Sequence, residues 1–144
     1  MPAQFVDVEV LSVHVPTAVR DELFRFAHAA APREACGFVL GTGRAEQAEV
    51  VLATLARNLS DSAARFEAHP EDQLAAEREA ERLGLHVLGS WHSHVHSAAR
   101  PSAADLACTS YPLALILSLR DESLAAFAGP RELALPDRQR PLSR

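Results

Sequence analysis

Apolar positions repeat along this chain with two different periods, and the period changes several times. Segments in which apolar residues alternate with polar ones, or form short continuous runs, predict β-strands. Segments in which apolar residues recur every three or four positions predict helices. The predicted strands cover residues 5–15, 35–41, 48–56, 85–91, 112–119, 123–128 and 131–135. The predicted helices begin after Pro16, at Pro70 and near Ser102.

Prolines and glycines mark where these elements are expected to end. Pro32 should end the first helix. Gly41 and Gly43 should end the strand over residues 35–41 in a turn, so that residues 35–56 form a hairpin. Pro70 suits the first position of the second helix, and Gly84 should end that helix. Because strands and helices are interspersed, we expect an α/β fold with a mixed sheet flanked by helices.

Length and composition predict a single domain of ordinary size. The chain has 144 residues, 48% of them apolar, so we expect a single domain over residues 1–135 and a loose tail over residues 136–144. The net charge of -5 gives no basic surface for nucleic acid. Apolar runs are too short for a membrane span, and the start of the chain lacks the pattern of a signal peptide. Two isolated cysteines, Cys36 and Cys108, favour a reducing, cytoplasmic location.

The most informative segment follows the strand predicted over residues 85–91. His92 and His94 are two positions apart, so on a strand they project from one face about 6.6 Å apart. That separation allows two imidazoles to converge on one metal ion. A catalytic zinc needs a third protein ligand and an open position for water, and Asp105 at the start of the next helix is a candidate.

These residues carry a resemblance to a known family. His92-x-His94, seven residues, Ser102, two residues and Asp105 match the motif spacing of the JAMM (MPN-plus) zinc metallopeptidases, and Glu34 matches their upstream glutamate. The chain resembles the minimal prokaryotic members, because it has no room for long insertions. The resemblance implies a partly curved sheet in a layout similar to cytidine deaminases.

The resemblance also implies roles. One Zn²⁺ ion per chain would be bound by His92, His94 and Asp105. Glu34 would be the general base that takes a proton from the attacking water and gives it to the leaving amine. Ser102 would help to stabilise the oxyanion. The implied substrate is a ubiquitin-like protein, a sulfur carrier or small modifier, cleaved at a Gly-Gly-type C-terminal tail.

Each part of the motif has a simpler interpretation when taken singly. Ser102 and Asp105 have the spacing of a helix capping box, and Glu34 alone is an ordinary charged residue. We expect His96 to be a loop residue, because an extended strand would separate it from His92 by about 13 Å. Val95 stands where family members often have proline, which puts the shape of the expected loop 93–101 in question.

Three other functions compete with the peptidase. A non-catalytic MPN scaffold would lack the ligand set that this chain keeps. A zinc deaminase would need a Cys-x-x-Cys signature, which the sequence lacks. A RadC-like member with no peptidase role would be favoured by a basic surface, which the charge does not supply. The sequence predicts no oligomeric state.

Overall fold

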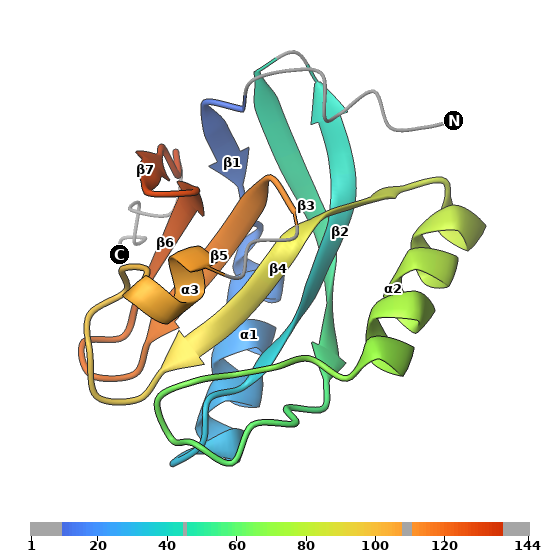
Figure 1. The fold of residues 1–144 in the computed structure, drawn as a ribbon. Helices are drawn as coiled ribbons and strands as arrows, with labels where there is room; N and C mark the ends of the chain where they lie inside the picture. Colours follow the sequence, from blue (N-terminus) through green and yellow to red (C-terminus); the bar gives the residue numbers. More distant parts are fainter. Residues whose placement is uncertain (1–9, 45, 108–110, 137–144) are drawn as a thin grey trace.

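Seven strands and three helices make up the computed structural model, which describes residues 10–44, 46–107 and 111–136 (Figure 1). The strands are β1 (Ser12–His14), β2 (Cys36–Arg44), β3 (Gln47–Ala56), β4 (His86–His94), β5 (Leu113–Ser118), β6 (Ser123–Ala128) and β7 (Arg131–Leu133). The helices are α1 (Thr17–Ala30), α2 (Pro70–Leu83) and α3 (Ala103–Ala107).

All seven strands belong to one mixed sheet in the order β1-β3-β2-β4-β5-β6-β7. The pairs β1–β3 and β4–β5 are parallel, and the other neighbours are antiparallel. The sheet curves until its two ends approach each other. There the Val13 N–H donates to the carbonyl of Ala134 at 2.9 Å, and a bridge joins Ser12 to Ala134. The predicted α/β fold with a partly curved mixed sheet is confirmed.

The main core lies between α1 and one face of the sheet. In Figure 1, α1 lies behind the sheet and α3 lies in front of it. Trp91 is fully buried in this core, stacks on Phe26 at 6.0 Å and donates its indole N–H to the Thr54 carbonyl at 2.8 Å. A Cβ on Gly37 would overlap that carbonyl and crowd the indole nitrogen, so glycine is required there. Trp91 thus points away from the face that carries its neighbour His92.

Helix α2 covers part of the opposite face. Its Ala76 and Ala80 pack against Cys36, Phe38 and Leu40 of β2. His69 is the N-cap residue, its Nδ1 accepts from the Glu71 N–H at 3.1 Å, and Pro70 is the first helical residue. The helix ends at Gly84, where a φ of 73° is the left-handed conformation that glycine tolerates.

Two element boundaries were wrong in the sequence analysis. Gly41 and Gly43 lie inside β2 rather than in a turn, and a Cβ on Gly41 would overlap the Glu49 carbonyl of β3. Gly41 therefore reflects close backbone approach between β2 and β3. Strand β4 continues to His94, because His94 pairs with Ser118 of β5, so the loop expected from residue 93 begins at 95.

Some predicted features fall outside the described residues. These are residues 5–9 of the first predicted strand and residues 137–144 of the predicted tail. Within the described ranges, none of the helices has the length and apolar character needed to cross a bilayer.

Candidate metal centre

Strand β4 places His92 and His94 on one face at its C-terminal end. The strand is hydrogen-bonded to β2 on one side and to β5 on the other, so its backbone is held along both edges. His92 is 2% exposed and His94 is 5% exposed. Two imidazoles buried this deeply need partners for their ring nitrogens, because an unpaired buried polar atom costs free energy.

Asp105 approaches the two histidines from the first turn of α3. The Asp105 N–H donates to Ser102 Oγ at 3.0 Å, and the Ser102 N–H donates to Asp105 Oδ2 at 2.8 Å. This reciprocal pair is the capping-box arrangement that the spacing of the two residues also allowed. It fixes the carboxylate of Asp105, whose side chain is only 10% exposed, toward β4.

Three side-chain atoms converge at the centre. His92 Nε2 and His94 Nε2 each lie 3.1 Å from Asp105 Oδ2, and the two nitrogens lie 3.2 Å apart. A tetrahedral zinc with bonds of about 2.0–2.1 Å has ligand-to-ligand edges of roughly 3.3–3.4 Å. The observed triangle is therefore close in size to one face of such a coordination shell, and the residues fit the metal that the motif implies.

The second nitrogen of each ring gives the histidines different supports. His94 Nδ1 lies 2.8 Å from the Ala98 carbonyl, which can only accept, so we assign the proton to Nδ1. That tautomer directs the lone pair of Nε2 at the centre, as in many metal-ligating histidines. His92 Nδ1 is buried without a hydrogen-bond partner among the described residues. Its ring is held instead by stacking on Phe66, with centroids 4.4 Å apart.

Burial and hydrogen bonding act in opposite directions on the ionisation of this cluster. Burial raises the pKa of Asp105, but the bonds from His92 and His94 outweigh it and hold the pKa well below its usual range. Burial lowers the pKa of His92. Burial opposes protonation of His94 too, yet the bonds to Asp105 and the Ala98 carbonyl leave its pKa raised. An ionised carboxylate beside two imidazoles is a donor set suited to a dication.

Glu34 lies beside this cluster on the segment between α1 and β2. It is 4% exposed, and its Oε1 has no hydrogen-bond partner among the described residues. Burial raises its pKa to about 7, with His94 lowering it and Asp105 raising it further. One ligand atom each from Glu34, His92 and His94 lie within 4.8 Å of one another, so these three could also hold a metal. A carboxylate with this pKa can accept a proton near neutral pH.

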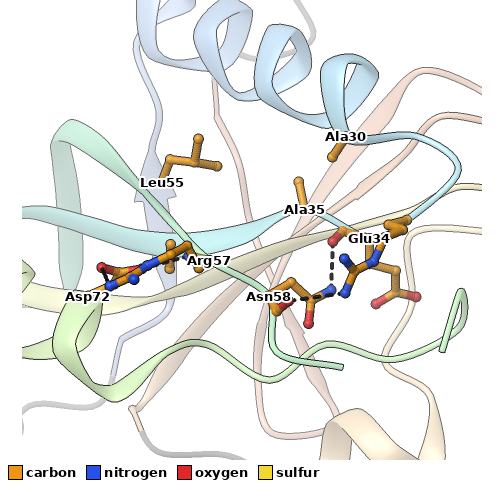
Figure 2. A pocket seen from close by; sticks show the side chains of 9 residues that line it. Ala30, Glu34, Ala35, Leu55, Arg57, Asn58 and Asp72 are labelled. Carbon is orange, nitrogen blue, oxygen red and sulfur yellow. Dashed lines mark hydrogen bonds and ion pairs between the residues drawn. The ribbon is translucent and has the colours of Figure 1, made fainter. Parts of the chain in front are cut away.

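Two residues that sequence reasoning missed fix the position of Glu34. Ser93, fully buried between the two histidines, accepts the Ala35 N–H on its Oγ at 2.8 Å and donates its own N–H to the Ala35 carbonyl at 3.0 Å. The Asn58 side chain donates to the Glu34 carbonyl at 2.9 Å, as Figure 2 shows. Glu34 and the two histidines are therefore tied together through the backbone.

The hollow drawn in Figure 2 borders Glu34 but not the histidines. It has a volume of about 500 Å³ and lies among the C-terminal end of α1, the end of β3 and Asp72. Its two guanidinium groups are already engaged. Arg33 binds the backbone carbonyls of Asn58 and Ser60, and Arg57 binds Asp72 at 2.9 Å. We therefore place the chemistry at the histidine cluster rather than in this hollow.

The remaining predicted residues lie around the centre. Ser102 is exposed, and because its Oγ accepts the Asp105 N–H its hydroxyl proton is free to be donated. His96 is exposed in the loop after β4 and is not part of the metal-capable cluster found among the described residues. Cys36 is buried on β2, and Cys108 lies outside the described residues.

Comparison with known proteins finds one named relative and several similar solved structures. Over 73 residues the chain is 38% identical to the Desampylase of Pyrococcus furiosus, a match that covers 51% of this chain and 49% of the relative. The chain thus spans about half the length of that protein. Solution structures from Desulfitobacterium hafniense (TM-score 0.78, 29% identity, 85% of this chain and 90% of that one) and Salinibacter ruber (TM-score 0.64, 33% identity, 91% and 95%) are similar.

Two further findings bear on the family. The crystal structure of a JAB1/MPN domain protein from Archaeoglobus fulgidus shares the fold, with a TM-score of 0.54 and 16% identity over 87% of this chain and 96% of that one. The family model for prokaryotic homologs of the JAB domain matches residues 16–131. The resemblance to the minimal prokaryotic JAMM/MPN proteins is confirmed, and the chain belongs to the family of prokaryotic homologs of the JAB domain.

Proposed function

We propose that this protein is a zinc-dependent metallopeptidase that hydrolyses an amide or isopeptide bond at the C-terminal tail of a ubiquitin-like protein. The observation that carries the proposal is the triangle of His92, His94 and Asp105 atoms, 3.1–3.2 Å on its edges. Beside it lies Glu34, whose Oε1 has no hydrogen-bond partner in the described part of the chain. The catalytic domain would comprise residues 1–135, and the proposed location is the cytoplasm.

In this proposal His92, His94 and Asp105 hold one Zn²⁺ ion per chain. When bound, the ion would supply Lewis-acid polarisation of the scissile carbonyl and would lower the pKa of water. Glu34 then accepts the proton of the attacking water and delivers it to the leaving amine, for which a pKa near 7 is suited. Burial raises the pKa of the Cys36 thiol to about 12, so this cysteine is a poor nucleophile and none is required.

Ser102 is the proposed oxyanion donor. Its backbone N–H and its Oγ are both used in binding Asp105, which orients the side chain. The hydroxyl proton remains for the developing charge on the scissile carbonyl oxygen. The same residue therefore caps α3 and stabilises the transition state.

A ubiquitin-like substrate is supported by the similarity to the Desampylase of Pyrococcus furiosus. A Gly-Gly-type tail suits a metal centre on a strand end, because glycines let the substrate backbone approach where a side chain would clash. Main-chain hydrogen bonds to the edge of a strand or loop would supply affinity that does not depend on sequence.

Cleavage of a ubiquitin-like protein fused through its tail to a reporter tests the proposal. We expect zinc-loaded protein to release the reporter, Glu34→Gln to release it at least about 100-fold more slowly, and a tail ending in Ala-Ala to be cleaved more slowly than one ending in Gly-Gly. Equal cleavage of both tails would leave a general peptidase. No cleavage by zinc-loaded protein would favour the non-catalytic scaffold or a RadC-like role.

A further inference from the structure

A second, smaller hollow lies on the sheet face that carries the metal centre. Its volume is about 210 Å³, and it is lined by Phe38, Phe66, Glu67, Ala68, Gln73, Ser90 and Tyr111. Pockets for small molecules and cofactors measure about 300–1,000 Å³. This hollow is below that range, so its size suits a single side chain better than a cofactor.

The hollow is adjacent to the candidate centre through Phe66. The Phe66 ring stacks on His92, with an angle of 22° between the ring planes, and also lines the hollow. Ser90 precedes His92 by two residues on the same face of β4, a distance of about 6.6 Å along the strand. An extended substrate that follows β4 covers the same distance in two residues.

An aromatic wall forms one side of the hollow. Phe38 and Tyr111 meet edge to face at 5.9 Å and form an aromatic wall. The Tyr111 hydroxyl donates to Glu77 at 2.8 Å and accepts from Gln73 at 3.0 Å, so it presents its ring rather than a free hydroxyl. The charged residue in the lining is Glu67, which would repel a carboxylate.

We propose that this hollow is a specificity pocket that binds one branched or aromatic apolar side chain of the substrate, carried by the third residue from the scissile bond. The inference rests on the proposed peptidase function and adds to it a preference for the residue that precedes the two glycines of the tail. Glycines at the bond itself pass the Phe66 ring, and the residue beyond them occupies the pocket.

Filling the pocket tests the proposal. Ala68 lines it, whereas Ala64 is exposed on the same loop, so Ala68→Phe and Ala64→Phe form a matched pair. Tail substrates carry Gly, Leu, Phe, Asp or Arg at each of three positions on either side of the bond. We expect kcat/KM to be at least tenfold higher for Leu or Phe than for Gly, Asp or Arg at the third position from the bond.

The variants then decide whether this preference arises in the pocket. Ala68→Phe should reduce the preference to within twofold while zinc content and Tm are retained, and Ala64→Phe should keep it. Ala68→Leu, which adds less volume, replaces Ala68→Phe if the latter lowers Tm. The proposal is overturned if no position shows a preference, if Arg or Asp is preferred, or if the filled variant discriminates as well as the wild type.

A binding measurement separates this proposal from the proposed function. N-acetyl-leucinamide and N-acetyl-glycinamide are titrated into zinc-loaded protein and followed by NMR at the amides of Phe66, Ala68 and Ser90. Saturable shifts with the leucine probe alone, lost in Ala68→Phe, support the pocket even if no substrate is cleaved. Cleavage of ubiquitin-like tails without such shifts would retain the peptidase and reject the pocket.

Discussion

The surroundings of Glu34 differ greatly from those of a glutamate on the surface. It is nearly fully buried, one of its carboxylate oxygens has no partner among the described residues, and burial raises its pKa to about 7. The unfolded chain would lose this proton near pH 4.5, whereas the folded protein keeps it to about pH 7. The cost of ionising Glu34 in the fold is therefore absent below pH 4.5, grows between these values and is complete above pH 7.

This cost predicts a pH-dependent effect of Glu34→Gln on the metal-free protein. The free energy of unfolding of the variant, relative to wild type, should increase by about 3 kcal/mol between pH 4.5 and pH 8. Chemical denaturation at several pH values measures it, and Glu81→Gln, an exposed position on α2, controls for loss of a charge. A difference that stays constant with pH would show that Glu34 is not held in the way described.

Glu34→Gln also separates the base from the ligands in the zinc-loaded protein. Removing a general base lowers turnover by about 10²–10⁴-fold, and we expect a loss of that size with zinc content unchanged. Turnover and zinc content are measured on the same preparation. Loss of zinc would instead make Glu34 a ligand, which its place within 4.8 Å of both histidines also allows.

The motif residues could be predicted because their spacing along the chain reflects local geometry. Two histidines on one strand face and a carboxylate in a helical first turn are short-range features. Asn58, Ser93 and Phe66 could not be predicted, because their roles depend on which backbone groups the fold brings near them. An asparagine, a serine and a lone phenylalanine have no spacing that marks such contacts.

At the scale of elements, the side chain of Asn58 makes several of the hydrogen bonds that hold the segment from β3 to α2. Asn58 Oδ1 accepts the N–H groups of Ser60 and Glu67 at 2.9 Å each, while its Nδ2 donates to the Glu34 carbonyl. Asn58 thereby connects the loop that carries Phe66 to the segment that carries Glu34. The boundaries of β2 and β4 were mispredicted for a related reason, since strand pairing carried both strands past the expected ends.

Substitutions of Asn58 should separate these two connections. Asn58→Ala removes both and is expected to lower the free energy of unfolding by about 1–3 kcal/mol. Asn58→Asp keeps the acceptor for the loop but loses the donor to Glu34, so we expect a lower kcat with little change in KM. Denaturation and steady-state kinetics provide the measurements, and a wild-type kcat in Asn58→Asp would contradict the connection to Glu34.

At the scale of the whole molecule, the closing contact between β1 and Ala134 joins parts of the chain that periodicity could not pair. It completes a curved sheet with α1 on one face and α2, α3 and the candidate centre on the other. Successive side chains of β2 and β4 point to opposite faces of the sheet, so they alternate between the core under α1 and the face that carries the candidate metal centre. Cys36 lies on the centre's side, yet it is fully buried and its pKa is raised to about 12.

This burial predicts how the folded protein responds to reagents. In a Cys108→Ser variant, which leaves Cys36 as its single cysteine, iodoacetamide at pH 8 should modify the thiol only after unfolding. Activity should persist through this treatment and be lost on exposure to a strong chelator. Mass spectrometry and the cleavage assay follow both changes. Rapid modification of the native protein together with inactivation would indicate a thiol mechanism.

The most direct test of the central claim is the zinc content of protein purified without added metal, measured by elemental analysis. The arrangement of His92, His94 and Asp105 predicts one zinc per chain in the wild type and in Glu34→Gln. It predicts loss of that zinc in His92→Ala, His94→Ala and Asp105→Ala, each checked for retained fold by circular dichroism. A folded His92→Ala or His94→Ala variant that keeps a full equivalent of zinc would contradict the proposed metal centre.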